Sequence, residues 1–267
     1  MDARGKLLSR INLAAAAVHL VIALGVIITG IAKETASATF AVFRLRMNVT
    51  DDTFPDAVLS IHLAETRFSI FGVAVFIPLF TCFCHLLYGY LFTEKYLDEV
   101  YSGIHTHRWI EYCISAPLMA DLLLFLSGGR DLVQLILCHA IFTGIMGCGY
   151  WTQVVALDVA QIKRASNGVW RDFLFALIVP CAIFIFWISS IVLSYTPNHS
   201  DAPSWVVHLL WILICMFTIF IAPLGLHLVQ RWPLETRYVA VEVAYIFLSL
   251  VAKTTLEIVL AYNVFAA

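Results

Sequence analysis

Seven stretches of about 20 or more mostly apolar residues run through this chain, and they constrain its fold more than any other feature. About 20 apolar residues in a helix cross the roughly 30 Å hydrocarbon core of a bilayer. The chain is 61% hydrophobic and 13% charged, whereas soluble domains have about 45–50% apolar and about 25% charged residues. We therefore predict an all-α membrane protein, one seven-helix domain over residues 1–267. The predicted spans are Ile11–Ala32, Phe68–Phe92, His105–Ser127, Leu132–Asp158, Phe173–Tyr195, Trp205–Val229 and Tyr238–Ala261.

The charge and motif content argues against several classes of protein. A formal net charge of −2 does not fit a nucleic-acid binder, whose surface carries an excess of Lys and Arg. The seven cysteines form no CxxC pair, so we expect neither a disulfide framework nor a metal site. The sequence contains no phosphate-binding loop and no hydrolase nucleophile motif, so we expect no enzyme.

The first connection, residues 33–67, is long and contains the only strand-like pattern in the sequence. Thr39–Val49 alternates and is rich in β-branched and aromatic residues, Asp51–Pro55 supplies a turn, and Ala57–His62 could return. We predict a small β-hairpin in this loop. Because so small a hairpin is not stable alone, we expect another surface to cover it.

The distribution of basic residues predicts the orientation of the chain in the membrane. Ten Lys and Arg residues fall on the face that carries the N-terminus and five on the opposite face. Because basic residues concentrate on the cytoplasmic side, we expect a cytoplasmic N-terminus and an extracellular C-terminus. The sequons at Asn48 and Asn198 then lie outside. The hairpin loop is on that extracellular side.

Lys253 constrains the chemistry of the protein more than any other residue. Of the 16 Lys and Arg residues, it is the one in the middle of a predicted span. A cation at that depth costs about 3 kcal/mol on insertion scales, and Lys253 is too far from either interface to snorkel easily. One interpretation is an ammonium ion paired with a carboxylate as internal glue. The other is an amine that forms a Schiff base with a carbonyl ligand in a dry pocket.

A protonated Schiff base in a dry pocket requires a counterion, and Glu111 is the candidate. It lies about one turn into the third predicted span, and pairing with Lys253 would remove the penalty of both buried charges. Arg108 lies three residues earlier on the same helix face, where it could bond to water or to the Glu111 carboxylate. The alternative is that Glu111 is an interfacial or capping carboxylate.

Together these segments resemble the heliorhodopsins, a family of retinal proteins with inverted membrane orientation. The resemblance rests on Arg108-Trp-Ile-Glu111-Tyr112-Cys-Ile-Ser115, on Ser249-Leu-Val-Ala-Lys253, on the cytoplasmic N-terminus and on the long first loop with its hairpin. It covers the whole chain, and the two helix motifs together are specific. It implies a seven-helix rhodopsin bundle in lipid that binds all-trans retinal. It also suggests a homodimer in which the hairpin crosses to its neighbour.

The resemblance implies roles for individual residues as well. Lys253 would carry all-trans retinal, Glu111 would be its sole primary counterion, and Ser249 would occupy the position where ion-pumping rhodopsins keep a second carboxylate. Glycines on the fourth span would leave room for the retinal ring, although such patterns also serve plain helix–helix contact. The residues expected to flank or pack against retinal are Tyr112, Ser115, Met119, Met146 and Gly149.

A proton-accepting polar cluster is expected near the Schiff base, and its candidate members are His19, His85, Arg108 and Glu242. The two histidines match positions that the family uses as a polar cluster able to hold the Schiff-base proton. The alternative is that they are hydrogen-bonded between helices without titrating. Glu242 lies eleven residues before Lys253, about 16 Å toward the cytoplasm, and is expected to line a cavity there. Other histidines, His139 among them, are interpreted as structural.

Asp121 and Glu257 are carboxylates at membrane depth that depart from the family pattern. Glu257 lies one turn beyond Lys253, and Asp121 lies ten residues beyond Glu111. Because an ionisable residue in the bilayer is a functional candidate, the two could form an outward proton path. The alternative is that both lie near the outer interface and are wet.

These observations lead to three functional hypotheses. The first is a photoreceptor in which light isomerises retinal, the Schiff-base proton leaves for a nearby polar group, and moving helices signal to a cytoplasmic partner. The second is a light-driven or light-gated proton transporter or channel, motivated by Asp121 and Glu257. The third is a receptor or scaffold that does not respond to light.

Overall fold

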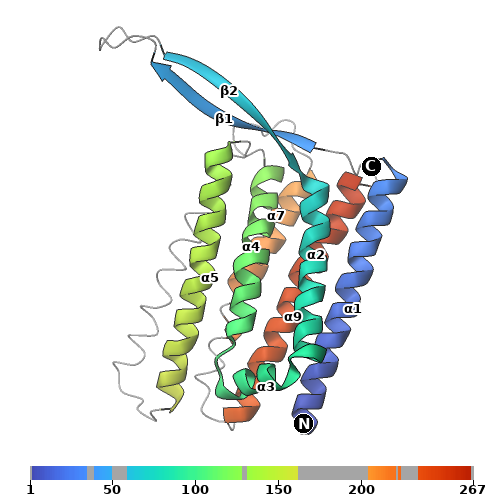
Figure 1. Cartoon of the computed structure of the whole chain (residues 1–267), viewed down its shortest axis with the longest axis vertical. Coiled ribbons are helices and arrows are strands. Elements are labelled where there is room, and N and C mark those ends of the chain that lie inside the picture. Colours follow the sequence, from blue (N-terminus) through green and yellow to red (C-terminus); the bar gives the residue numbers. More distant parts are fainter. Residues whose placement is uncertain are drawn as a thin grey trace.

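The computed structural model describes residues 2–34, 39–49, 59–127, 131–161, 204–220, 222–223 and 234–265. Long helices lie side by side in a bundle, with the two chain ends at opposite ends of it (Figure 1). The α-helices in the described part are α1 (Ala3–Ala32), α2 (Ile70–Leu86), α3 (Thr93–Ser102), α4 (Thr106–Leu126), α5 (Leu132–Gln161), α7 (Ser204–Ile219) and α9 (Leu234–Leu260). Two π-helical turns, η2 (Leu87–Leu91) and η4 (Ala261–Phe265), extend α2 and α9.

Five helices in the described part are long and apolar enough to cross a membrane: α1, α2 with η2, α4, α5 and α9 with η4. They coincide with five of the predicted spans, so the prediction of an all-α membrane fold is confirmed. Helix α7 has 16 residues and coincides with the first part of the sixth predicted span. The fifth predicted span, Phe173–Tyr195, lies outside the described residues.

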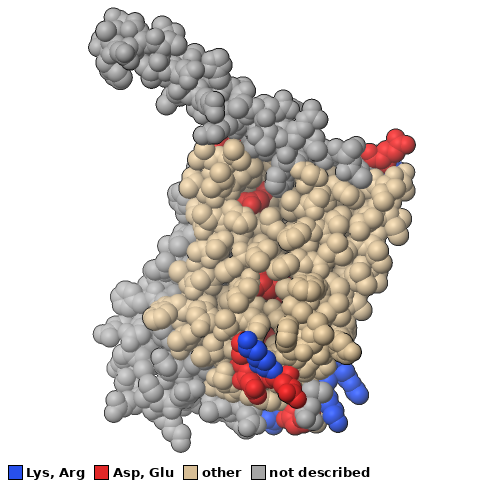
Figure 2. Space-filling view, viewed as in Figure 1, with Lys and Arg blue, Asp and Glu red and all other residues tan. Residues whose placement is uncertain are grey.

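The outer surface of the bundle is apolar because it faces lipid. Large side chains such as Val21, Ile28, Trp151 and Phe247 are more than 60% exposed, as expected for helices that are hydrophobic all round. Charged side chains gather at the end of the molecule that carries the N-terminus and α3, and the face between the ends is almost uncharged (Figure 2). This arrangement matches a bilayer around the middle of the bundle.

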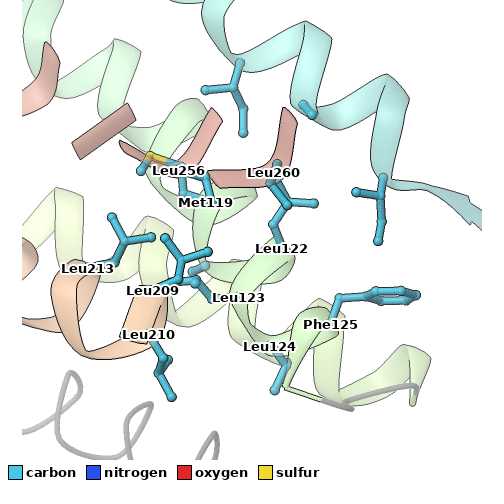
Figure 3. Close-up of a cluster of buried hydrophobic side chains, with 14 of the residues drawn as sticks. Met119, Leu122, Leu123, Leu124, Phe125, Leu209, Leu210, Leu213, Leu256 and Leu260 are labelled. Atoms are coloured by element: carbon cyan, nitrogen blue, oxygen red, sulfur yellow. The ribbon is translucent and has the colours of Figure 1, made fainter. Parts of the chain in front are cut away.

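The apolar core fills the half of the bundle farther from α3. The second half of α4 supplies a run of buried residues from Met119 to Phe125, which packs against leucines of α7 and α9 (Figure 3). Polar side chains gather in the other half, nearer the N-terminus. The core residues that Figure 3 labels are Met119, Leu122, Leu123, Leu124, Phe125, Leu209, Leu210, Leu213, Leu256 and Leu260.

Two strands, β1 (Thr39–Val49) and β2 (Leu59–Ser69), pair in antiparallel register, with Thr39 opposite Ser69 and Val49 opposite Leu59. They project beyond the end of the bundle opposite the N-terminus (Figure 1). Strand β1 has the bounds expected from the sequence, whereas β2 starts two residues later and ends seven residues later than the expected return. The turn expected at residues 51–55 lies outside the described residues.

Helix α3 occupies a connection in which the sequence analysis expected no element. It lies across the end of the bundle that carries the N-terminus (Figure 1). Its buried residues are Tyr96, Leu97 and Val100. Their spacing puts them on one face of the helix, and this apolar face packs against the bundle. Gly103, at φ 81°, adopts the left-handed conformation that ends the helix. The spacing of these three apolar residues was the signal that could have predicted it.

Candidate functional site

Lys253 and Glu111 meet in the interior of the bundle. Lys253 Nζ of α9 donates a hydrogen bond to Glu111 Oε1 of α4, and each side chain is 3% exposed. The Lys253 Nζ atom also lies 5.5 Å from the centre of the Tyr112 ring. The structure therefore brings together the amine and the carboxylate that the sequence analysis paired. Each charge offsets the cost of burying the other.

Small hydroxyl side chains are buried around this pair. Ser249, one turn before Lys253, is 2% exposed and lies beside Tyr112. Ser115, one turn after Glu111, is 1% exposed, and its hydroxyl has no hydrogen-bond partner among the described residues. A buried hydroxyl without a partner is costly. The Ser115 hydroxyl is therefore available to a polar or polarisable ligand next to the ion pair.

Aromatic rings cover the Lys253–Glu111 pair on the side of the N-terminus. Trp109, Tyr112 and Tyr245 form one cluster, with ring centres 6.1–6.4 Å apart. Met146 of α5 contacts both this cluster and the leucine-rich core. Met119 belongs to the leucine-rich core.

The space at Gly149 is filled by a protein side chain. A Cβ atom at this position would lie 2.3 Å from Cζ3 of Trp109, so the glycine allows the indole ring to approach α5. The Trp109 Nε1–H donates to Gln153 Oε1 at 2.5 Å, which fixes the ring. The sequence analysis reserved this space for the retinal ring. In this structure Gly149 allows close packing of α4 on α5, and its expected role toward retinal stays a prediction.

Arg108 binds Glu242 and not Glu111, which corrects one of the two expectations for it. Its Nη1 donates to Glu242 Oε2 at 2.5 Å, its Nη2 donates to Gln153 Oε1 at 3.3 Å, and its Cζ lies 3.8 Å from the centre of the Tyr245 ring. The physical reason is that Lys253 already neutralises Glu111. Arg108 extends toward the N-terminal end of its helix, where Glu242 is the acid of α9.

Glu242 accepts hydrogen bonds from three residues. Besides Arg108, Tyr96 donates to Oε1 at 2.9 Å, and His105 Nδ1 lies 2.5 Å from Oε2. The carboxylate is only 5% exposed. The sequence predicted that Glu242 lines a cavity, and the structure places it inside a buried network of charged and polar side chains.

Two members of this network lie outside the membrane-spanning helices, and burial shifts the pKa of both. Burial, together with the charge of Arg108, lowers the pKa of His105, although Glu242 acts in the opposite direction. Burial and the charge of Glu242 raise the pKa of Tyr96 well above its usual value. Both groups are therefore held in their neutral forms at neutral pH.

His19 and His85 lie against each other between α1 and α2. Their rings are stacked, with centres 5.8 Å apart and planes 9° from parallel. His85 Nδ1 contacts Asn12 Oδ1 at 2.7 Å, and the charges of Glu111 and Lys253 both act on His85. His85 Nε2 and both nitrogens of His19 are buried without a hydrogen-bond partner in the described structure. In a neutral imidazole one ring nitrogen carries no hydrogen, so each histidine has one nitrogen that a proton could occupy.

Asp121 and Glu257 lie on the other side of Lys253, toward the hairpin. His139 Nδ1 lies 2.9 Å from Asp121 Oδ2, so His139 has a carboxylate partner that the sequence did not reveal. Glu257 is completely buried, and neither of its oxygens has a hydrogen-bond partner among the described residues. The expectation that both carboxylates are wet is therefore wrong for Glu257, whose carboxyl lies in the protein interior.

Sequence reasoning missed four residues of the polar network: Asn12, Tyr96, His105 and Gln153. Asn12 and Gln153 are 1% and 0% exposed, and each bonds to more than one partner. Polar residues within apolar spans are a general signal of internal contacts. That signal was present for Asn12 and Gln153, but it does not indicate which residues they bind.

Comparison with known proteins identifies the family. The chain matches the heliorhodopsin family over residues 8–267. Two cyanorhodopsin crystal structures are similar over 100% of this chain and 98% of their own: that from Calothrix sp. NIES-2098, with 12% identity and a TM-score of 0.53, and that from Tolypothrix sp. NIES-4075, with 15% identity and a TM-score of 0.50. At such identities these structures indicate the fold alone. No curated protein is significantly similar to the chain. Because the family match spans nearly the whole sequence, this chain belongs to the heliorhodopsins, membrane proteins with the rhodopsin fold.

Proposed function

We propose that this retinal-binding photoreceptor is a light sensor that signals without pumping ions, and that its chromophore is all-trans retinal on Lys253. The observation that carries the proposal is the buried pair of Lys253 and Glu111. A lysine amine held in a dry, nearly closed site with one carboxylate is suited to covalent attachment of a carbonyl ligand.

The residues around the pair fit retinal. The amine of Lys253 would hold it, the Glu111 carboxylate would balance the positive charge, and the free hydroxyl of Ser115 and the ring of Tyr112 would face it. When bound, retinal supplies absorption of visible light and a change of shape on isomerisation. Met146 and Met119 line the apolar regions that adjoin the pair.

The histidine pair is the proposed destination of the proton that leaves Lys253. His19 and His85 each have a buried ring nitrogen without a hydrogen-bond partner among the described residues, and both interact electrostatically with Lys253. A proton on this pair would separate charge from Glu111 inside the bundle. Such a change of charge can move helices that have two stable arrangements.

The proposed output lies at the end of the bundle that carries the N-terminus, the cytoplasmic end by its count of basic residues. Helix α3 lies there and is bound to the network through Tyr96. A half-open cleft of about 1160 Å³ is lined by residues of α3, of η2 and of the start of α1. A cytoplasmic signalling partner could contact this surface when α3 moves.

Reconstitution with retinal tests the proposed function. All-trans retinal added to the purified protein should give a visible absorption band that hydroxylamine bleaches, and Lys253→Ala should stay colourless. Under voltage clamp, illumination should produce no steady photocurrent. A wild-type protein that stays colourless would overturn retinal binding, and a steady current would overturn the sensor.

A proton transporter is the second candidate, and buried Glu257 is the observation that favours it. A carboxyl without a partner one turn from Lys253 could take part in a path through Asp121 and His139. Against it, the described residues contain no hydrogen bond that joins Glu257 to either of them. A steady photocurrent that Glu257→Gln abolishes would establish this alternative.

The hairpin supports a further proposal, that the protein forms a homodimer. Strands β1 and β2 project beyond the bundle (Figure 1), and a two-stranded hairpin needs a surface to pack against. The hairpin would cover, and be covered by, the neighbouring subunit. Light scattering in mild detergent should give the mass of a dimer, and a monomer would contradict this proposal.

A further inference from the structure

Asn12 is the link between the histidine pair and Glu242. His85 Nδ1 contacts Asn12 Oδ1 at 2.7 Å, Asn12 Nδ2 contacts Tyr96 Oη at 3.1 Å, and Tyr96 donates to Glu242 Oε1 at 2.9 Å. These contacts run through α2, α1, α3 and α9. Every side chain in the series is buried.

The carbonyl of Leu8 fixes the orientation of the Asn12 amide. Asn12 Nδ2 lies 3.0 Å from this carbonyl oxygen, which can only accept a hydrogen bond. The NH₂ group must therefore face Leu8 and Tyr96, and the amide oxygen must face His85. It follows that His85 carries its hydrogen on Nδ1 and donates it to Asn12. The other nitrogen of His85, Nε2, is the one that can accept a proton.

Asn12 is the one member of this series that cannot pass a proton on. Imidazole, phenol and carboxylate groups gain and lose protons, whereas a carboxamide only donates and accepts hydrogen bonds in the ordinary pH range. A proton on His85 Nε2 leaves the bond from Nδ1–H to Asn12 in place. The amide oxygen does not take that second hydrogen, and the amide NH₂ does not release one to Tyr96.

We propose that Asn12 blocks proton transfer between the His19–His85 pair and Glu242, and so keeps the proton from Lys253 inside the protein. This inference rests on the proposed function, because light must deliver a proton to the histidines. Beyond the block, hydrogen bonds join Tyr96 to Glu242 and Glu242 to His105, the residue that precedes α4 at the end of the bundle. Asn12 therefore decides between a stored proton and a released one.

The charged groups on either side agree with this role. Lys253 acts electrostatically on both histidines and Glu111 acts on His85, while Arg108 and His105 contact Glu242. Because both contact its carboxylate, Glu242 is held in a hydrogen-bonded network on the far side of Asn12. Replacing the amide by a group that titrates would make the series of titratable side chains from His85 to Glu242 continuous.

Asn12→Asp tests the inference, with a pH-sensitive dye in the medium and flash illumination of the retinal-loaded protein. In the wild type, the visible band should shift as Lys253 loses its proton, while the pH of the medium stays constant. In Asn12→Asp, the medium should acidify transiently, by up to one proton for each protein that loses the Lys253 proton. The double variant Asn12→Asp with Tyr96→Phe should lose this release, because the next carrier is removed.

Asn263→Asp is the matched control. Asn263 is also a helical asparagine whose Nδ2 donates to the carbonyl four residues earlier, at 2.9 Å from Val259, but it lies at the other end of the bundle. This variant should keep the medium pH constant. Asn12→His supplies a second titratable replacement if Asn12→Asp does not fold. Proton release by the wild type, or a folded, coloured Asn12→Asp that releases none, would overturn the inference.

A measurement on the retinal-free protein tests the geometry independently of light. ¹⁵N NMR of labelled histidine should find His85 with its hydrogen on Nδ1 in the wild type, and Asn12→Leu should remove that preference. A hydrogen on Nε2 in the wild type would overturn the inference. A colourless protein with the expected tautomer would instead overturn only the proposed function.

Discussion

Arg108 and Glu111 lie three residues apart on α4, yet they bind residues that are eleven positions apart on α9: Glu242 and Lys253. Eleven residues of helix correspond to about 16 Å along its axis and three residues to about 4.5 Å, and the long side chains of Arg108 and Lys253 together bridge the difference. Glu111 and Glu242 therefore each have their own cation. This separation leaves Glu111 as the carboxylate that faces the amine of Lys253.

Removal of the Glu111 charge should change the colour of the retinal-loaded protein. In Glu111→Gln the positive charge near Lys253 Nζ loses its partner, so the ground state is destabilised and the visible band should move to longer wavelength. The protonated form should also be lost at lower pH than in the wild type. Absorption spectra recorded from pH 5 to pH 10 measure both effects.

Glu257→Gln is the control for this prediction, since Glu257 is also a buried acid on α9, one turn from Lys253. Because no described residue binds its oxygens, the spectrum should change little. Equal shifts in the two variants would contradict the assignment of Glu111 as the counterion.

Loss of the Glu242 charge should destabilise the fold. In Glu242→Gln, buried Arg108 would keep its charge without a carboxylate, and breaking a buried pair in this way costs about 3–5 kcal/mol. Thermal unfolding in detergent should show a clearly lower midpoint. Glu94→Gln, at an exposed position of α3, should leave the midpoint nearly unchanged, and equal losses would contradict the role of the network.

Acidification should destabilise the protein through His105. Burial and the charge of Arg108 lower the pKa of His105 below its ordinary value of 6.5. Below about pH 6.5, His105 therefore binds a proton more readily in the unfolded chain than in the folded protein. The contribution of His105 to the free energy of unfolding is therefore fully present above about pH 6.5, and it is lost as the pH falls toward the folded-state pKa. Unfolding midpoints between pH 7.5 and pH 5 measure this.

His105→Asn should weaken that pH dependence, because asparagine does not titrate. His208→Asn, which replaces an exposed histidine of α7, is the comparison. If both variants kept the slope of the wild type, His105 would not be its source.

A methyl group at Gly149 should disturb the aromatic cluster. In Gly149→Ala the new Cβ would overlap the ring of Trp109 at 2.3 Å, which forces the indole to move and costs about 1–3 kcal/mol. Gly147→Ala on the same helix meets nothing within 4 Å and should stabilise the protein by about 0.4–1 kcal/mol. If the thermal unfolding midpoints of Gly149→Ala and Gly147→Ala fell equally, the contact between Gly149 and Trp109 would be contradicted.

The amino-acid sequence by itself determined the membrane class, the positions of the described spans and the two residues at the centre of the site. Span length follows from bilayer thickness and local hydrophobicity, so it can be counted along the chain. Lys253 and Glu111 stood out because a charge in an apolar span needs a partner whatever the detailed packing. The sequence also identified the family, which the match over residues 8–267 confirms.

Only the tertiary structure decided which polar groups meet. The choice of Glu242 as the partner of Arg108, the contact of Trp109 with Gly149 and the bridge made by Asn12 all join different helices. Such pairs depend on which helices are neighbours and on the depth of each side chain, neither of which is a property of one segment. Helix α3 is the same case, since ten residues with three apolar positions become a stable helix when the bundle supplies a surface to cover them.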